Sequence, residues 1–555
     1  MKSTMLSHLF LSLVSMFFVG IKTNAQPIGK DRPNIIYIMT DDQSSIVPGP
    51  DDNTSTQADG GGVQSHPFGF NGDKDVYTPI IDGLAKNGLI FSKAYVSSSV
   101  CSPSRYTTLT GRYAGRCQGR SFIQQFPSGK MTRVENNTEL EENRENVARL
   151  LQKAGYRTGF VGKSHVIDHH ILNRKDEWGS LGLMSYEQGD DPKDPDVSEA
   201  MAHNHQFWAN RIKDFGFDYA NGVYAANLRE LHNDSLNVHH VEWKNKAALD
   251  FIEDSGDEPF FLYYSETVPH GPAPWLNKDG KYLYGLDANP HFTSAGYYQD
   301  EFKNMPERDR IKAEIDAAGK DPDHAWLRWF DHAVGAVIEK LKEKGKLENT
   351  LIIITSDHGN YNYGKSTLYE GGIKIPLMMY WPAGIEPGQV YEELVQNIDF
   401  APTFLDLAGV DLKTVKELDG VSLKETLNGD DKPVHDHLYF EMGFARGVMT
   451  KDWKYIAVRY DDQNEQQIKE GIIFKGWNGH DHQLPYYIRN SHLGYHAALL
   501  NEHYFERDQL YNLTKDPKEN NNLFDAHPKK TKEMKKLLEE SLKSFPSRPY
   551  GEFTK

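Results

Sequence analysis

The sequence predicts an α/β fold, in which a large, mostly parallel sheet is flanked by helices and a smaller C-terminal α+β domain is built on an antiparallel sheet. Short apolar runs alternate with helical patterns along most of the chain, as expected for a parallel sheet covered on both faces. Polar clusters directly follow several of these runs, and ligands of such folds bind beyond the carboxyl ends of the strands. The pattern changes near 428–433, where a Gly/Asp/Pro-rich stretch separates the two parts.

The helices and strands of the larger part are predicted from the periodic spacing of hydrophobic residues and from turn residues. The β-branched run after Pro33 predicts a buried strand that ends at Asp41 and Asp42, and 44–74 reads as loop. Thr78 suits a helix N-cap with proline at the first position. In chain order, strands are expected at 33–40, 88–91, 94–96, 157–162, 260–264, 350–355 and 377–380. Helices are expected to begin at Pro79 and Ser102 and to span 145–151, 244–253, 326–344 and 402–407.

The predicted domains are a signal peptide at 1–25, a catalytic domain at 26–430 and a C-terminal subdomain at 431–555. Alternating patterns at 437–440 and 453–460 predict antiparallel strands, and 530–544 has the spacing of an amphipathic helix. The N-terminus places Lys2 before an apolar run at 9–20, with small residues ahead of a cut near Gln26. We therefore expect export to a periplasm or to the medium, without membrane insertion.

The overall charge excludes one class of partner. The chain of 555 residues carries 62 Lys and Arg against 79 Asp and Glu, a net charge of −17. Such an acidic surface disfavours nucleic-acid binding through a broad basic face. An anionic substrate would therefore have to be attracted by a local cluster of cations and a metal.

The segment 97–112 contains the most specific motif, Cys101-Ser-Pro-Ser-Arg105, at the predicted start of a helix. A helix N-terminus offers unpaired N–H groups and partial positive charge, which suit an anionic reaction centre. The chain has two cysteines, so a disulfide between Cys101 and Cys117 is the alternative interpretation.

This motif resembles the maturation signature of the type I sulfatases, members of the alkaline-phosphatase-like superfamily, and the resemblance extends from about residue 33 to about residue 525. It implies that a formylglycine-generating maturation enzyme oxidises Cys101 to formylglycine. One hydroxyl of the hydrated aldehyde would attack sulfur, and the other would later release the sulfate, which serine could not easily do.

Two pairs of potential metal ligands follow predicted strands, and their residue types predict a site for a hard divalent cation. Asp41 and Asp42 follow the first strand, and Asp357 and His358 follow the strand at 350–355. Carboxylate oxygens suit calcium or magnesium. The resemblance implies one calcium ion, held by these four residues and by the modified Cys101. The family often has Asn where this chain has His358.

The resemblance also implies five catalytic residues. Arg105 would hold the hydrate at residue 101, and Lys163 and His165, in a Gly-Lys-x-His element, would contact sulfate and assist proton transfer. His270 would be the general acid that faces the leaving oxygen, and Lys365 would bind the sulfate. Taken singly, each side chain is more often an ordinary loop residue.

Two stretches, 165–240 and 477–504, are rich in histidine and aromatic residues and are expected to shape specificity. Such side chains suit sugar rings and their anionic substituents, although many will simply be packed. The candidates are His169, His170, His203, His205, Trp208, Tyr224, His232, His239 and His240 in the first stretch. In the second they are Tyr486, Tyr487, Arg489, His492, Tyr495, His496, His503 and Tyr504.

We therefore expect an exported sulfatase that acts on a sulfated carbohydrate, such as oligosaccharides from a sulfated polysaccharide. An arylsulfatase acting on small esters is the close alternative. A phosphonate monoester or phosphodiester hydrolase of the same superfamily is a second enzyme class, and a carbohydrate-binding protein without catalysis is the non-enzyme interpretation.

Overall fold

The structure, a computed structural model, describes residues 32–46, 66–272, 285–360, 364–475, 481–488, 498, 500–545 and 553. The predicted signal peptide and part of the loop predicted at 44–74 lie outside these residues, as does most of the stretch 477–504. Among the described helices, none is both long and apolar enough to cross a bilayer.

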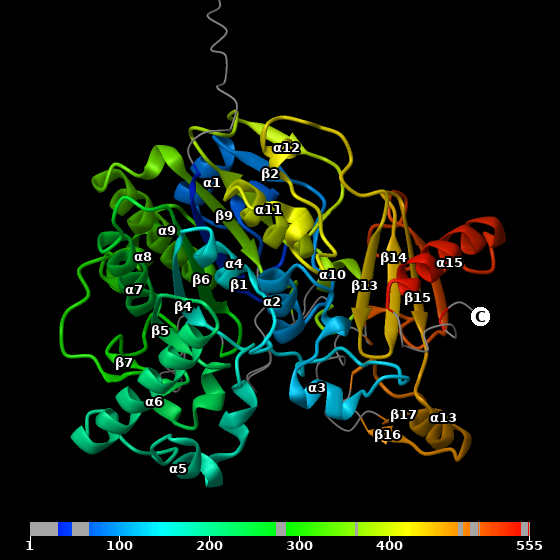
Figure 1. The fold of residues 1–555 in the computed structure, drawn as a ribbon, viewed down its shortest axis with the longest axis horizontal. Coiled ribbons are helices and arrows are strands. Elements are labelled where there is room, and N and C mark those ends of the chain that lie inside the picture. The colour runs from blue at the N-terminus through cyan, green and yellow to red at the C-terminus, as the bar shows by residue number, and fades with distance from the viewer. Residues whose placement is uncertain are drawn as a thin grey trace, which may run out of the picture.

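Among the described residues, eight strands form the large sheet (Figure 1). They are β1 (Asn34–Asp41), β2 (Leu89–Phe91), β4 (Arg157–Lys163), β5 (Tyr219–Tyr224), β6 (Phe260–Pro269), β9 (Thr350–Ser356), β10 (Leu377–Tyr380) and β11 (Gln389–Tyr391). Their order is β11–β2–β10–β9–β1–β6–β4–β5. The five strands from β9 to β5 run parallel, and β10 is antiparallel to both of its neighbours. The predicted mostly parallel sheet is confirmed.

Helices cover both faces of the sheet, which explains why β1 is apolar along its length. Ile36 and Ile38 belong to one core with helices α1 (Pro79–Lys86), α7 (Val241–Glu253), α8 (Arg308–Ala317) and α9 (Ala325–Glu343). Tyr37 and Met39 point into the other core, with α2 (Cys101–Thr110), α4 (Val147–Lys153), α6 (Pro195–Asp214) and α11 (Phe400–Leu407). Shorter helices are α3 (Arg120–Gln125), α5 (Trp178–Leu181), α10 (Glu370–Ile373), α12 (Lys424–Leu427) and α13 (Asp462–Lys469).

The predicted elements of the larger part exist, and their ends differ by a few residues. Helix α2 begins at Cys101 itself, one residue before the predicted start, and β6 continues past the predicted end to Pro269. In the described part, six further short strands form two-stranded pairs: β3 (Ala94–Tyr95) with β12 (Val395–Gln396), β7 (Phe292–Thr293) with β8 (Gly296–Tyr297), and β16 (Phe474–Lys475) with β17 (Asp481–His482).

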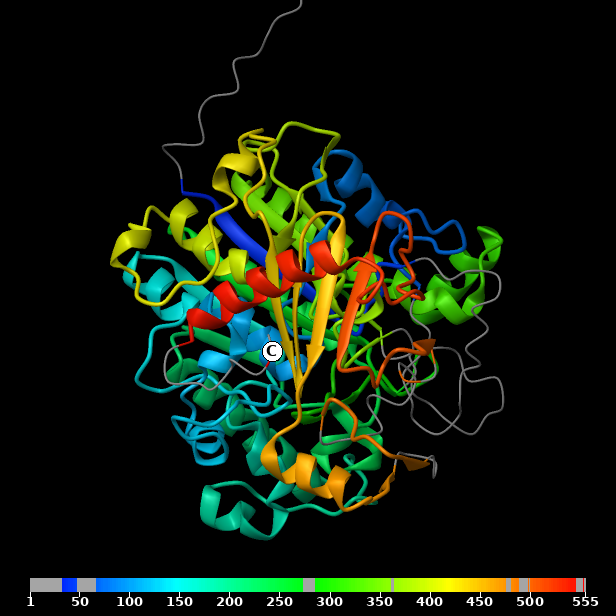
Figure 2. The ribbon, with the colours of Figure 1, turned by 90° about the vertical axis from the view of Figure 1, so that its right-hand side faces the viewer.

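The described C-terminal part contains a four-stranded antiparallel sheet, as predicted. Its order is β13 (Leu438–Met442), β14 (Ala445–Met449), β15 (Trp453–Val458) and β18 (Asp508–Asn512). Figure 2 shows helix α15 (Pro528–Lys543) lying across these strands. Met534, Leu538 and Leu542 of the helix pack on Tyr455 and Val448 of the sheet. The boundary at residue 431 stays a prediction.

A buried ion cluster joins the C-terminal sheet to the first residue of α10. Lys454 of β15 lies 2.8 Å from a carboxylate oxygen of Glu370 and 2.8 Å from one of Glu519. The Glu370 backbone N–H donates to Glu519 at 2.7 Å. Burial and the neighbouring Glu370 raise the pKa of Glu519 to about 7, against the effect of Lys454. The lysine is therefore the charge that keeps two buried carboxylates together.

Replacing Lys454 by methionine should destabilise the fold by about 3–5 kcal/mol, because both carboxylates would lose their buried cation. The measurement is urea-induced unfolding at neutral pH. Lys451→Met is the matched control, since Lys451 pairs with Glu393 at the surface and such pairs contribute up to about 1 kcal/mol. Equal midpoints for the two variants would contradict this assignment.

Candidate active site

The pairs Asp41-Asp42 and Asp357-His358 meet at one edge of the sheet because β1 and β9 are adjacent and parallel, with Thr40 opposite Ser356. Asp41 ends β1, and Asp42 has a positive φ of 67°, which turns the chain out of the strand. The Asp42 N–H donates to Asp357 Oδ1 at 3.1 Å, so the two strand ends are joined directly.

The Cys101 thiol lies over this edge. Its Sγ atom is 3.7 Å from Asp41 Oδ1 and 3.5 Å from His358 Nε2. Two ammonium groups also approach it, Lys163 Nζ at 3.6 Å and Lys365 Nζ at 3.9 Å. The first residue of α2 thus faces carboxylates, an imidazole and cations from four other segments of the chain.

Arg105 lies one turn further along α2, and its guanidinium is completely buried between two carboxylates. Its NH2 group is 3.0 Å from Asp357 Oδ2 and 3.2 Å from Asp41 Oδ2. Its NH1 group donates to the Lys163 carbonyl at 3.0 Å and to the Ser265 hydroxyl. Arg105 therefore fixes the ends of β1, β4, β6 and β9 relative to one another.

Lys163 ends β4, and the residue before it must be glycine. Gly162 has φ 94°, and a Cβ there would lie 1.7 Å from the Ser265 carbonyl oxygen of the adjacent strand. This close approach directs the Lys163 side chain into the site, where its ammonium pairs with Asp41 and donates to Asn227 Oδ1 at 2.6 Å.

The remaining predicted catalytic residues lie around the same atoms. Lys365 Nζ is 2.7 Å from Asp42 Oδ1, and His270 Nε2 is 4.0 Å from Asp42 Oδ2. His165 is buried, and His165 and His270 both lie near enough to the Cys101 thiol to help Lys163 and Lys365 lower its pKa. The structure brings all the predicted site residues together; their individual roles stay predictions.

The electrostatics favour a negatively charged group at residue 101. Burial opposes ionisation of Cys101, yet Lys163 and Lys365 hold the pKa of its thiol well below the usual range. Burial and the proximity of Asp41 raise the pKa of Asp357, whereas Lys163 keeps the pKa of Asp41 low despite burial. The cations thus stabilise an anion at the first residue of α2.

The donor set fits a divalent cation. One ligand atom each from Asp41, Asp42, Cys101 and His358 lies within 4.8 Å of the others, and all four residues are buried. Buried carboxylate oxygens brought this close repel each other unless a cation lies among them. Asp357 borders this group, with Oδ2 at 3.6 Å from His358 Nε2, and its oxygens bond to Arg105 and the Asp42 N–H.

The alternative disulfide is absent, since Cys101 and Cys117, both within the described part of the chain, are free. Cys117 is buried, and burial raises the pKa of its thiol to about 12. The two cysteines therefore have opposite ionisation tendencies, and the ionisable one is the residue in the motif.

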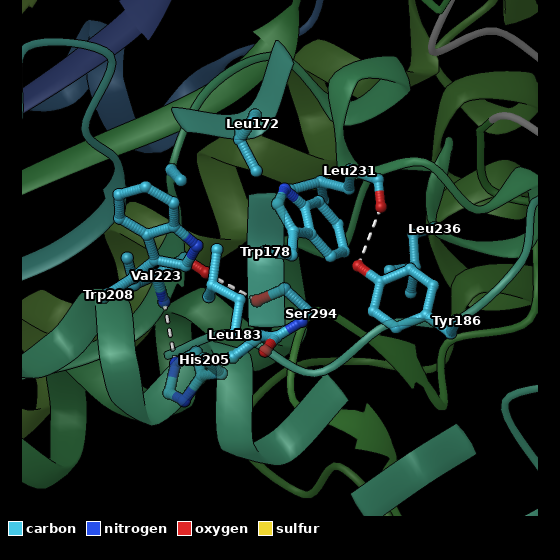
Figure 3. A pocket seen from close by; sticks show the side chains of 12 residues that line it. Leu172, Trp178, Leu183, Tyr186, His205, Trp208, Val223, Leu231, Leu236 and Ser294 are labelled. Carbon is cyan, nitrogen blue, oxygen red and sulfur yellow. Dashed lines mark hydrogen bonds between the residues drawn. The ribbon is translucent and has the colours of Figure 1, made fainter. Parts of the chain in front are cut away.

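Several aromatic and histidine residues predicted to shape specificity are packed inside the protein. His205 and Trp208 line a small cavity of about 20 Å³ beside Trp178, enough for about one water molecule (Figure 3). His205 Nε2 accepts there from the Val223 N–H at 3.2 Å. Tyr224, His239, His240, Tyr486, Tyr487 and Tyr504 are also buried. Such residues support the fold. The ring of His169 packs against that of His165, with 4.8 Å between the ring centroids.

Two partners of the predicted catalytic side chains were not expected from the sequence. Asn227 accepts from Lys163, and Ser265 accepts from Arg105. Ser265 belongs to the extension of β6 beyond its apolar run, and Asn227 follows β5, which was not predicted. Asn227 is a polar residue shortly after the end of β5, so a prediction of that strand would have pointed to it.

The comparisons with known proteins agree on a family. The family model described as Sulfatase matches residues 33–410, and one described as N-sulphoglucosamine sulphohydrolase, C-terminal, matches residues 356–469. The chain is 24% identical over 612 residues to an N-acetylglucosamine-6-O-sulfatase of Bacteroides thetaiotaomicron, covering 97% of this chain and 91% of that protein. It is 24% identical over 507 residues to the ulvan-active sulfatase of Formosa agariphila, covering 89% and 76%.

Solved structures share the fold. The PsFucS1 sulfatase from Pseudoalteromonas sp. has a TM-score of 0.52 and 19% identity, covering 93% of this chain and 91% of that one. A structure in complex with its substrate D-glucosamine-2-N,6-O-disulfate has a TM-score of 0.53 and 19% identity, covering 92% and 98%.

Replacing Gly162 by alanine should displace Lys163 and cost far more than the roughly 1–2 kcal/mol of a left-handed backbone alone. Gly155→Ala is the matched control, since Gly155 also has a positive φ, of 81°, but its added Cβ would meet only Arg32 at 3.7 Å. Thermal unfolding of both variants measures the difference. Similar losses of stability would show that the contact with Ser265 is unimportant.

Proposed function

The chain belongs to the sulfatase family and hydrolyses sulfate esters, and on that premise we propose that its substrate is a sulfated carbohydrate. The proposal is that it acts, after export to a periplasm or the medium, on oligosaccharides from a sulfated polysaccharide. Relatives named for N-acetylglucosamine-6-sulfate and for ulvan support the carbohydrate class. The N-terminal apolar run supports export.

One observation carries the mechanism: the side chain of residue 101 is buried among three cationic residues and three carboxylates at the ends of adjacent strands. We propose that a maturation enzyme converts Cys101 to formylglycine. The hydrated aldehyde would supply a hydroxyl nucleophile together with a second hydroxyl for sulfate release.

Asp41, Asp42, Asp357, His358 and residue 101 would hold one calcium ion, whose charge makes a bound hydroxyl easier to deprotonate. This assignment follows from the carboxylate-rich donor set. It leaves Arg105 to hold Asp41 and Asp357 in place from the opposite side.

The other side chains have roles set by their positions and charges. Lys163 and Lys365 bring ammonium groups within 4 Å of residue 101, where they would bind sulfate oxygens and stabilise the negative charge of the transition state. His165, which lies beside residue 101, would accept a proton from it during sulfate release. His270 would donate a proton to the leaving sugar oxygen.

Production with a formylglycine-generating enzyme should yield protein that releases sulfate from N-acetylglucosamine 6-sulfate or another sulfated sugar. Cys101→Ala should lower kcat/KM by at least about a thousandfold, because the nucleophile is lost. Mass spectrometry should find the aldehyde in the peptide containing residue 101.

Cys117→Ala is the control for this experiment, because Cys117 is equally buried but outside the site, and it should retain activity. Matched phosphate diesters and 4-nitrophenyl sulfate test the other substrate classes. Faster turnover of the phosphate diester, or an unmodified Cys101 in active protein, would refute the proposal.

Calcium should raise the temperature of unfolding, because a ligand that binds only the folded state stabilises it by about 2.7 kcal/mol at a hundred times its Kd. Chelation should reverse the shift, and Asp42→Asn should abolish it. Asp406→Asn, which removes a surface carboxylate paired with Lys424, should leave the shift intact. A calcium shift that persists in Asp42→Asn would exclude this site.

A further inference from the structure

A buried histidine lies behind His270 and bonds to the backbone that carries it. His239 comes just before α7, and its side chain is fully buried. Its Nε2 atom is 3.1 Å from the His270 carbonyl oxygen and 2.8 Å from the Pro272 carbonyl oxygen. Its Nδ1 atom is 2.9 Å from the Thr267 hydroxyl. One imidazole therefore bonds to three residues of the segment 266–272.

These partners determine which nitrogen carries the proton. Carbonyl oxygens can only accept, so Nε2 of His239 is the donor to both carbonyls. Burial, with the nearby Lys244, lowers the pKa of His239 to about 3, so the ring is neutral at physiological pH and its Nδ1 accepts. The Thr267 hydroxyl must then donate to Nδ1.

Lys244, one turn into α7, completes the arrangement. Its buried ammonium donates to Thr267 Oγ1 at 2.6 Å and pairs with Glu266 at 2.7 Å. Because the ammonium occupies a lone pair of the Thr267 oxygen, the hydroxyl hydrogen is left to point toward His239. A series of hydrogen bonds thus runs from Glu266 through Lys244, Thr267 and His239 to the His270 carbonyl, and each bond has one donor and one acceptor.

The segment needs such support because the sheet does not hold it regularly. Met39 of β1 pairs with Ser265 of β6, but Asp41 pairs with Pro269, so the register shifts between them. Backbone bonds of the ladder are interrupted at this point. Side chains from the start of α7 instead bond to the end of β6.

We propose that His239 is a positioning residue for His270. It holds the carbonyls of residues 270 and 272, so that the His270 imidazole directs Nε2 toward residue 101 and Asp42. Nδ1 of His270 bonds to the Gly271 carbonyl at 2.9 Å, which leaves Nε2 as the nitrogen that faces the site. This inference rests on the proposed role of His270 as general acid.

The chemical consequence depends on the leaving group. As the hydroxyl oxygen of residue 101 bonds to sulfur, the ester S–O bond breaks and its electron pair stays with the leaving oxygen. Because the Nδ1–H of His270 donates to the Gly271 carbonyl, the leaving oxygen takes the Nε2 proton of a doubly protonated His270 and leaves the ring neutral. A sugar alkoxide is strongly basic and needs this proton, whereas 4-nitrophenolate is a stable anion without it. Loss of general acid catalysis costs about 10²–10⁴-fold, so a misplaced His270 should slow sugar sulfates selectively.

The first test is backbone hydrogen exchange of residues 266–272 in the full chain, which needs no activity. His239→Leu should increase exchange in this segment, whereas His239→Gln, which keeps a donor near Nε2, should stay close to wild type. His240→Leu is the matched control, because His240 is the adjacent residue, is equally buried and bonds to the Tyr224 hydroxyl at 2.9 Å. Unchanged exchange in His239→Leu, or an equal increase in His240→Leu, would overturn the proposal.

The second test compares two substrates of the matured enzyme. In His239→Leu, kcat on a sugar sulfate should fall by about ten- to a hundredfold with little change in KM, and kcat on 4-nitrophenyl sulfate should fall less than about threefold. His239→Gln should restore most of the loss. Thr267→Val, a milder change, should give a smaller loss with the same selectivity. It tests the same series of hydrogen bonds if His239→Leu does not fold.

Equal losses on both substrates would overturn the positioning role, because they would show a general disturbance of the site. If the matured wild-type protein hydrolyses no sulfate ester, the proposed function fails, and the exchange experiment still decides whether His239 holds the segment.

Discussion

The structure depends on the buried guanidinium of Arg105 between Asp41 and Asp357. Parallel strands bring both carboxylates to one edge of the sheet, where burial and mutual repulsion would otherwise drive them to take up protons. One arginine satisfies both and also bonds to the ends of β4 and β6. Lys163 also holds the pKa of Asp41 low, so this carboxylate stays ionised at the edge of the sheet despite its burial.

Local backbone features then place each cationic or acidic group. The glycine before Lys163 permits a contact with Ser265 that any side chain would prevent. The positive φ of Asp42 turns the chain at the end of β1. The register of β6 against β1 shifts before the segment bearing His270, and the side chains of His239 and Lys244 bond to this segment. The side chains of the candidate site thus lie at irregular ends of the sheet strands, which is where ligands of α/β folds bind.

The sequence predicted the strands at 33–40 and 350–355 because strands buried on both faces read as continuous apolar runs. It predicted the convergence of Asp41 and Asp357 because neighbouring parallel strands end at one edge. It missed β5, whose Tyr-Ala-Asn-Gly-Val-Tyr run lacks a strong period, and with it Asn227. The sequence could not distinguish the buried His239 from histidines at the surface, because composition does not show which side chains are buried. Position 101 at the helix start was predictable from the motif.

The most direct measurement is a crystal structure of the matured protein grown with calcium. The account predicts density for a hydrated aldehyde at residue 101 and a cation about 2.3–2.6 Å from oxygens of Asp41 and Asp42, with Arg105 still bridging Asp41 and Asp357. A thiol at residue 101 in catalytically active protein, or carboxylates turned away from an ion bound elsewhere, would contradict it.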